Sequence, residues 1–418
     1  MEKRIIQVEE RPPLLESIPL SLQHLFAMFG STVLVPFLFH VNPATCLLLN
    51  GFGTLLYLIL TKGKIPSYLG SSFAFISPVL VIIPQFGYAA AQGGFIIFGL
   101  LFCLFALIIR IAGLKWINVL FPPAAMGAIV AVIGLELAPV AAGMAGLTAK
   151  TPDANAILVS LFTLAITVLG SIAFRGFFSI IPVLIGVISG YALAYSLGMV
   201  DFKAVVEAGW FQMPTFYAPE FNLHAILIIA PAALVVLAEH MGHLVVTSNI
   251  VDRDLMKTPG LGRSLFADGL SNIISGFFGA TPNTTYGENI GVMAITRVYS
   301  VWVIGGAAAF AMVLSFVGKL TEAIRTIPVP VMGGVCLLLF GVIAASGIRM
   351  LVEAKVDYSK ARNLVLTSVI LIVGISGAKV NIGAISLQGM ALATIVAIFM
   401  SLSFKILDSL GLTNDRSN

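Results

Sequence analysis

The stretch Thr281-Pro-Asn-Thr-Thr-Tyr-Gly287 interrupts a long apolar part of the chain, and Tyr68-Leu-Gly-Ser-Ser-Phe73 does the same in the first half. Gly, Pro, Ser, Thr and aromatic residues favour extended backbone over helix in such stretches. Non-helical backbone at membrane depth persists only where it is buried in protein or lines a cavity. The two interruptions therefore predict a binding site near the middle of a membrane, between two broken segments.

The composition indicates that lipid surrounds most of the chain. Of its 418 residues, 59% are hydrophobic and 10% are charged, whereas soluble domains carry about 25% charged residues. Lys and Arg are scattered singly without a basic patch, which excludes nucleic acid as a partner. Cys46, Cys103 and Cys336 lie in apolar runs without the spacing of a metal site or disulfide framework, so we expect no metal and no cofactor. No linker divides residues 1–418, which predicts a single membrane unit.

Apolar segments near the spanning length of about 20 residues predict an all-α polytopic membrane protein with about 14 transmembrane segments. The predicted segments cover residues 18–38, 44–61, 71–86, 92–110, 120–139, 155–174, 178–199, 223–248, 263–279, 288–298, 299–318, 327–348, 363–378 and 386–405. The third and tenth are the short ones, and each follows one of the two extended stretches.

Lys and Arg are distributed unequally between the two sides of these segments. With the N-terminus inside, 18 of the 23 fall on the inner side. The five on the outer side are Lys150, Lys203, Lys319, Arg325 and Lys379. Because Lys and Arg collect in cytoplasmic loops, this distribution predicts cytoplasmic N- and C-termini.

Two similar helix starts indicate internal symmetry. Phe121-Pro-Pro-Ala-Ala-Met-Gly127 and Ile327-Pro-Val-Pro-Val-Met-Gly333 share Pro, Met and Gly at matching places and open the fifth and twelfth segments. A repeat of seven segments is odd, so the second copy must enter the membrane from the opposite side, as in the inverted repeats of many secondary transporters. The alternative is a chance match between two Pro-rich helix starts.

Carboxylates within the predicted segments are functional candidates, because a charge at the bilayer centre costs about 2.5–3.5 kcal/mol. Glu288 begins the helical part of the tenth segment, where free backbone N–H groups and the helix dipole favour an anion. The alternative is an ordinary charge at a helix start. For Glu136 and Asp268 two interpretations stay open, since each either lines a cavity or pairs with a loop cation.

Glu239 and His243 stand four residues apart in Ala238-Glu-His-Met-Gly-His243, on one face of the eighth segment. A carboxylate beside an imidazole can hold and pass a proton. The alternative is a buried ion pair that only fixes helix packing. His240 points elsewhere and is predicted to be structural, as is His24. The order Glu-His-x-x-His differs from the zinc-binding His-Glu-x-x-His, so zinc is not expected.

These motifs resemble a known family. Glu288-Asn-Ile-Gly-Val-Met-Ala-Ile-Thr-Arg297, together with Gly70-Ser-Ser-Phe73 and the Glu239 motif, is similar to the signatures of the nucleobase-ascorbate transporters. The resemblance extends over about residues 11–405. It implies 14 segments in two inverted repeats of seven, a homodimer, and a location in a bacterial inner membrane.

The resemblance also implies two units that move against each other. A core at about residues 14–112 and 223–318 would hold the substrate, and a gate at about residues 119–200 and 325–407 would slide against it. Phe340 would lie at the gate, where the branch that this chain resembles carries Tyr.

The first signature position differs between branches of the family, and Glu288 resembles the branch that takes uracil. The implied function is proton-coupled uracil uptake, and the alternatives are a purine, xanthine or other nucleobase symporter or an anion transporter of the same fold. An intramembrane enzyme with Glu239 and His243 as acid and base is a further alternative, but the sequence offers no evident nucleophile or metal set. We therefore expect a transporter and not an enzyme.

The implied substrate site consists of Ser72, Phe73, Glu239, Tyr286, Gly287 and Glu288. By resemblance, the two carboxylates hold uracil, backbone N–H groups of Phe73 and Gly287 donate to it, and Tyr286 flanks the ring. Uracil carries alternating N–H and C=O groups around a flat ring, which suits such a set of acceptors, donors and apolar walls. Two carboxylates in one small site cannot readily both ionise, so proton uptake by Glu239, Glu288 or His243 is expected.

Overall fold

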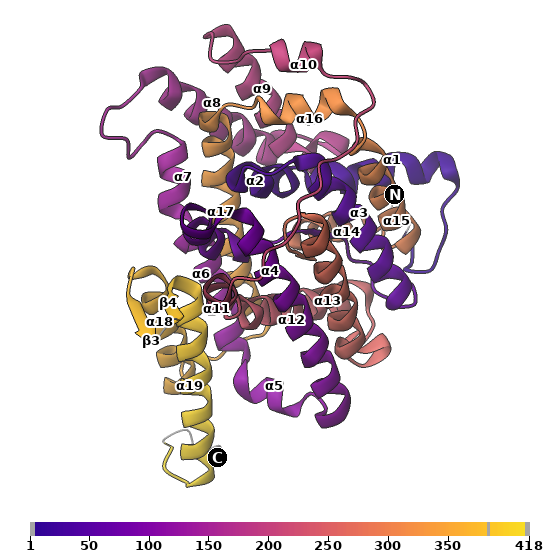
Figure 1. The fold of residues 1–418 in the computed structure, drawn as a ribbon. Coiled ribbons are helices and arrows are strands. Elements are labelled where there is room, and N and C mark those ends of the chain that lie inside the picture. Colours follow the sequence, from indigo (N-terminus) through magenta and orange to yellow (C-terminus); the bar gives the residue numbers. More distant parts are fainter. Residues whose placement is uncertain (1–4, 383–384, 414–418) are drawn as a thin grey trace.

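The computed structural model describes residues 5–382 and 385–413 of the chain. It is mostly helical, with two small antiparallel sheets (Figure 1). Lys3, Arg4 and Arg416, which belong to the predicted inner charges, lie outside the described residues.

The first half begins with helices that flank one short strand. Its elements are α1 (Leu14–Ala27), α2 (Phe29–Phe39), α3 (Pro43–Leu60), β1 (Leu69–Ser71), the 3-10 turn η1 (Phe73–Phe75), α4 (Ile76–Ala112), α5 (Lys115–Leu120), α6 (Pro123–Glu136), α7 (Ala138–Met144), α8 (Ala154–Ala173), the 3-10 turn η2 (Gly176–Ile180) and α9 (Pro182–Ser196).

The second half has a similar order of elements. It contains α10 (Lys203–Glu207), α11 (Leu223–Ile229), α12 (Ala232–Val251), the π-helical turn η3 (Met256–Gly260), α13 (Leu261–Phe278), β2 (Asn283–Thr285), α14 (Gly287–Thr296), α15 (Val301–Leu314), α16 (Gly318–Arg325), α17 (Val329–Glu353), α18 (Ala361–Ile375), β3 (Lys379–Ile382), β4 (Ile385–Gln388) and α19 (Gly389–Ser409).

Each predicted segment coincides with a helix, part of a helix, or a pair of helices joined by a short break. The third and fourth predicted segments lie within α4, which is kinked at Gly87, where the backbone leaves the helical conformation between the two segments. Gly87 has φ 78° and ψ 170°, a conformation that glycine adopts without a steric penalty. Among the described residues, eight helices are long and apolar enough to cross a membrane. The count of 14 crossings and the inverted repeat stay predictions.

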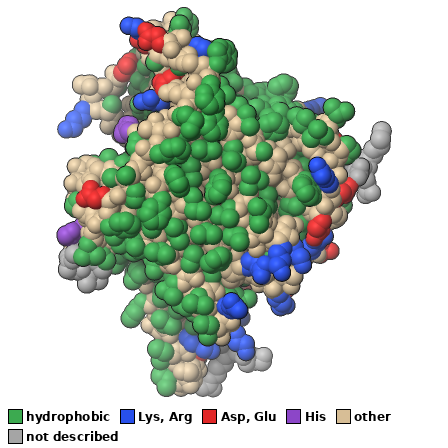
Figure 2. Space-filling model, turned by 45° about the vertical axis from the view of Figure 1, so that its right-hand side comes forward, with side chains coloured by type: hydrophobic (Ala, Val, Ile, Leu, Met, Phe, Trp, Pro, Cys, Tyr) green, Lys and Arg blue, Asp and Glu red, His purple; other side chains and the backbone are tan. Residues whose placement is uncertain are grey.

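The surface between the helix ends is apolar, as expected for a protein embedded in lipid. Figure 2 shows a broad, continuous field of hydrophobic side chains, with Lys and Arg gathered toward its margins. Exposed side chains such as Leu15, Ile172 and Phe399 are 71–89% accessible. Contact with hydrocarbon makes this exposure favourable where contact with water would not be.

Helix packing positions the two strands inside the protein. α13 packs against α4 and α3, and α15 packs against α3 and α1, whereas α17 packs against α6 and α8. β1 and β2 meet in the first of these groups as an antiparallel pair, with Gly70 opposite Thr284. The extended backbone predicted for both stretches is present, and every residue of the two strands is buried.

A second sheet was not predicted. β3 and β4 form an antiparallel hairpin before α19, where the sequence pattern indicated only a loop between the last two segments. The hairpin contacts α11 and α19 (Figure 1).

Candidate functional site

The candidate site lies where the two stretches that contain β1 and β2 meet as an antiparallel pair, which is called the crossing below. Each strand leads into a helix start at this point. β1 is followed by η1 and α4, and β2 is followed by α14. The backbone N–H of Ser72 donates to the carbonyl of Pro282 over 2.8 Å, which joins the two crossing stretches beyond the strand pair. Phe73 and Glu288, predicted from the sequence as site residues, therefore stand at neighbouring helix starts, as expected for a broken-segment site.

Three aromatic side chains cover this crossing. The ring of Phe73 lies 6.3 Å from that of Tyr286 and 6.0 Å from that of Phe340, measured between ring centroids. All three side chains are buried. Gly70 allows the ring of Tyr286 to pack closely against β1, since a Cβ on Gly70 would lie 2.7 Å from that ring. Phe340 belongs to α17, so the predicted gate residue contacts the predicted site directly.

The two predicted carboxylates lie on α12 and α14. Glu239 on α12 is within range of the electrostatic influence of Glu288 and Asp268. Glu288 stands in the first turn of α14. Among the described residues, Oε2 of Glu239 and Oγ of Ser72 are buried side-chain atoms without a hydrogen-bond partner. Because an unsatisfied buried polar atom costs about 1–3 kcal/mol, such atoms are suited to bind a polar ligand.

His243 contacts the joint between β2 and α14. Its Nδ1 lies 3.2 Å from Oγ1 of Thr285. A Cβ on Gly287 would lie 3.1 Å from Nε2 of His243, so the absence of a side chain at Gly287 leaves room for the imidazole. The histidine that was predicted to couple protons is thus next to Gly287, whose backbone was predicted to bind substrate and which precedes Glu288.

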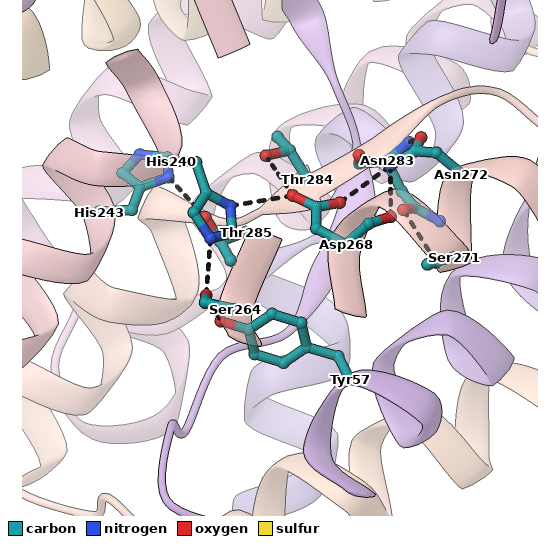
Figure 3. Close-up of polar contacts among 10 residues, drawn as sticks. All are labelled: Tyr57, His240, His243, Ser264, Asp268, Ser271, Asn272, Asn283, Thr284 and Thr285. Atoms are coloured by element: carbon teal, nitrogen blue, oxygen red, sulfur yellow. Dashed lines mark hydrogen bonds and ion pairs between the residues drawn. The ribbon is translucent and has the colours of Figure 1, made fainter. Parts of the chain in front are cut away.

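Behind the site lies a fully buried polar chain that begins at His240 (Figure 3). Nδ1 of His240 lies 2.9 Å from Oδ2 of Asp268, and its Nε2 lies 2.7 Å from Oγ of Ser264. Ser264 is in turn 2.6 Å from the hydroxyl of Tyr57. Asp268 therefore pairs with a histidine of the neighbouring helix α12. The sequence analysis had proposed that it lines a cavity or pairs with a cation in a loop.

Two asparagines fix the backbone of β2 and were missed by the sequence analysis. Asn272 accepts from the N–H of Asn283 and donates to its carbonyl, both at 2.8 Å. Nδ2 of Asn272 also donates to Oδ1 of Asp268 over 2.9 Å (Figure 3). Their signal was present in the sequence, since buried amides in apolar segments require partners.

Two other candidates lie away from the crossing of the strands. Oε1 of Glu136 accepts from the hydroxyl of Ser77 over 2.6 Å, and Oε2 accepts from the N–H of Met390 over 2.8 Å. His24 is buried, with its Nδ1 3.1 Å from Nδ2 of Asn289 on α14. Glu136 lines a cavity, which was one of its two predicted roles.

Comparison with known proteins gives a consistent result. A model of the Permease family matches residues 15–383. The uracil permease of Escherichia coli (strain K12) is 69% identical over 413 residues, covering 98% of this chain and 96% of the relative. The uracil permease of Bacillus caldolyticus is 47% identical over 413 residues, covering 96% and 95%. The putative pyrimidine permease RutG of Escherichia coli (strain K12) is 37% identical over 424 residues, covering 97% and 94%.

Solved structures share the fold at low identity. The transmembrane domain of the cyanobacterial bicarbonate transporter BicA aligns with a TM-score of 0.64 and 14% identity, covering 96% of this chain and all of that domain. SLC26A9 aligns with a TM-score of 0.69 and 12% identity, covering 96% of this chain and 66% of SLC26A9. At 12–14% identity, the similarity concerns the fold alone.

Proposed function

The chain belongs to the Permease family, and we propose on that basis that it is a secondary transporter for the uptake of uracil together with protons. One observation supports uracil as the substrate: two acidic and two aromatic side chains lie near the crossing of β1 and β2. They are Glu239, Glu288, Phe73 and Tyr286. Relatives that are 47–69% identical over nearly the whole chain are named uracil permeases. The family and the shared fold are those of transporters and give no support to an intramembrane enzyme.

Uracil fits this site by hydrogen bonding and by shape. Its N–H groups donate to the carboxylates of Glu239 and Glu288, and its carbonyl groups accept from backbone N–H groups of Phe73 and Gly287. The buried hydroxyl of Ser72 supplies a further polar contact. Phe73 and Tyr286 cover the faces of the ring, as aromatic side chains commonly do in ligand sites.

Proton coupling rests on the crowding of acidic groups. Glu239 and Glu288 share one site, with Asp268 close enough to act on Glu239. Two or three carboxylates in a low-dielectric site cannot readily all be ionised, so the loaded site takes up a proton. His243, which contacts Thr285 and lies beside Gly287, is the further proton-accepting group of this region.

The remaining parts of the proposal concern movement and surroundings. Residues 14–112 and 223–318 form the core, residues 119–200 and 325–407 form the gate, and Phe340 touches the substrate site from the gate side. The protein works as a homodimer in a bacterial inner membrane, with both termini in the cytoplasm. Residues 383 and 384 of the gate lie outside the described residues.

An anion transporter is the second candidate that the fold permits, since BicA is a bicarbonate transporter. Such a site presents N–H groups and positive helix ends to its ligand. Here Glu239 and Glu288 add two acidic side chains at the same place, which repels an anion. The carboxylates therefore favour a ligand that donates hydrogen bonds.

Uptake of labelled uracil by proteoliposomes tests the proposal. We expect accumulation when an inward proton gradient is imposed and only equilibration when the gradient is collapsed by an ionophore. Unlabelled uracil in excess should compete, whereas bicarbonate should not. Failure to take up uracil under both conditions, in protein that reconstitutes correctly, contradicts the proposed function.

His243→Ala separates coupling from binding. We expect the variant to lose most of its proton-driven accumulation while it still binds uracil, because Glu239, Glu288 and the backbone donors remain. His40→Asn is the control, because His40 is exposed at the end of α2 and asparagine accepts its left-handed backbone. A His243→Ala protein that concentrates uracil normally in response to the gradient removes His243 from the coupling mechanism.

A further inference from the structure

A cavity of about 370 Å³ lies between the two units of the proposed transporter. Its walls come from α4 and α11 on the core side and from α6, the β3–β4 hairpin and α19 on the gate side. Its polar lining residues are Ser77, Gln85, Glu136, His224, Lys379 and Gln388. Lys379 belongs to the loops that the charge distribution predicts on the outer side, so the cavity opens toward that side.

Glu136 bridges the two units at this cavity. It lies at the end of α6 in the gate, and it accepts a 2.6 Å hydrogen bond from Ser77 of the core helix α4. Its other oxygen accepts a 2.8 Å hydrogen bond from the N–H of Met390, in the first turn of the gate helix α19. Both carboxylate oxygens are thus used, and the free N–H groups at a helix start favour a negative charge there.

The local backbone is shaped for this contact. Gly389 has φ 53°, in the left-handed region, and a Cβ at this position would collide with the carboxylate of Glu136. Glycine relieves both constraints, because it accepts a positive φ and has no side chain. The loop into α19 therefore fits around the Glu136 carboxylate.

The bridge stands between the cavity and the uracil site. Ser77 follows Phe73 by four residues, and Phe73 is in contact with Phe340 of α17. Gly134, two residues before Glu136, lies so close to α17 that a Cβ there would collide with the carbonyl oxygen of Phe340. Pairwise contacts through Phe73, Phe340, α6 and Ser77 thus connect the cavity lining to the proposed uracil site.

We propose that Glu136 is a positioning residue that closes the outer entrance of the transporter, and that the cavity is the outer vestibule through which uracil reaches the site. The inference rests on the proposed function for the identity of the substrate. When the outer entrance opens, the hydrogen bond between Glu136 of the gate and Ser77 of the core breaks. The hydrogen bond between Glu136 and Met390, both in the gate, is kept. His224 and Lys379 face the same cavity, and within the described part of the chain neither forms an ion pair with Glu136.

A cysteine at the substrate site, which the proposal places behind this closure, reports on it. Ser72→Cys replaces a buried hydroxyl with a thiol at that site, and its reaction with a membrane-impermeant thiol reagent is followed in proteoliposomes. Protein without this substitution gives the background, since Cys46 and Cys336 are buried and Cys103 is partly buried. We expect Glu136→Ala to raise the labelling rate of the reporter about tenfold, the equilibrium effect of one lost charge-assisted hydrogen bond. Ser77→Ala should raise it by a smaller factor, because water can replace the hydroxyl.

Matched controls lie on the gate helix α17. Glu353 accepts a hydrogen bond from Arg349, and Ser346 donates one to the carbonyl of Val342, so both residues bond within their own helix. Glu353→Ala and Ser346→Ala should leave the labelling rate of the reporter unchanged. Unchanged labelling in both Glu136→Ala and Ser77→Ala, or an equal rise in the controls, overturns the assignment of Glu136.

Uracil binding by each purified variant keeps the two hypotheses apart. Binding by Glu136→Ala and Ser77→Ala shows that the variants are folded and that the substrate site is intact. If none of the proteins, including the parent, binds uracil, the proposed function fails while the labelling rates still decide the role of Glu136.

Discussion

The region around β2 and the contact between α6 and α17 are held together by different forces. Around β2, four fully buried residues are linked by an ion pair between His240 and Asp268 and by hydrogen bonds from Asn272 to Asp268 and to the backbone of Asn283. Between α6 and α17 the helices meet at glycines, and a Cβ on Gly347 would lie only 2.5 Å from the carbonyl oxygen of Gly127. The first region is fixed by directional bonds and the second by close, non-directional packing.

This difference matches the tasks proposed for the two regions. A buried polar network favours one arrangement, because displacement breaks its ion pairs and hydrogen bonds at high cost. It therefore keeps the two crossing strands, and with them the uracil site, in a single geometry. Helices that meet through small residues pack tightly without such directional constraints. The gate can then move as a compact unit against a rigid site.

The largest effect on function is expected at the site itself. Glu288→Gln replaces a charged acceptor by a neutral amide in a buried place, and we expect uracil affinity to fall by about tenfold to a hundredfold, the cost of one unmatched buried polar group. Glu239→Gln should act in the same way. The measurement is calorimetric titration in detergent, with Glu353→Gln on α17 as the control. Near-normal affinity of Glu288→Gln would remove α14 from the substrate site.

The next prediction concerns the stability of the polar region. Asp268→Ala leaves His240 and Asn272 short of a partner in the protein interior, and we expect a loss of about 3–5 kcal/mol in the free energy of unfolding. Asp408→Ala breaks a more exposed ion pair with Arg362 and should cost less than about 1 kcal/mol. Chemical unfolding in detergent compares the two. Equal losses would mean that the network around β2 does not fix the core.

The sequence predicted those features that residue type alone determines. The extended strands followed from Gly, Pro, Ser and Thr in two short stretches, and the place of Glu288 at a helix start followed from the same breaks. The partner of His240 could not be predicted, since Asp268 stands 28 residues away on another helix and only the packing of α12 on α13 joins them. The kink at Gly87 falls at the predicted boundary between the third and fourth segments.

A pair of glycines tests the packing of the gate. A Cβ on Gly134 of α6 would collide with the backbone of α17, whereas a Cβ on Gly341 would meet nothing within 4 Å. We expect Gly134→Ala to lower the unfolding free energy by about 1–3 kcal/mol, as overpacked contacts do. Gly341→Ala should raise it by about 0.5–1 kcal/mol, because alanine favours helix. If both substitutions stabilise the protein, the close approach of α6 and α17 is not required.

The smallest effect is expected at the edge of the core, where an exposed ion pair contrasts with the buried network. The extended segment from Ile6 to Val8 pairs with the residues that follow α14, and Glu9 beside it forms a 2.5 Å ion pair with Arg253. The hydrogen bond from Arg253 holds the pKa of the Glu9 carboxyl below its usual value. A lowered folded-state pKa stabilises the protein above the unfolded pKa of about 4.3, and this stabilisation is lost as the pH falls through the folded value.

Glu9→Gln should therefore be less stable than the parent protein at neutral pH, and the difference should shrink as the pH falls below about 4. The side chains of Glu9 and Arg253 are 54% and 38% exposed, so solvent screening limits the difference to less than about 1 kcal/mol. Added salt should reduce it further. Arg253→Gln should give the same loss, and the double variant should add little to either single one, because both remove one interaction. A difference that stays constant from neutral to acidic pH would show that Glu9 contributes through packing and not through its charge.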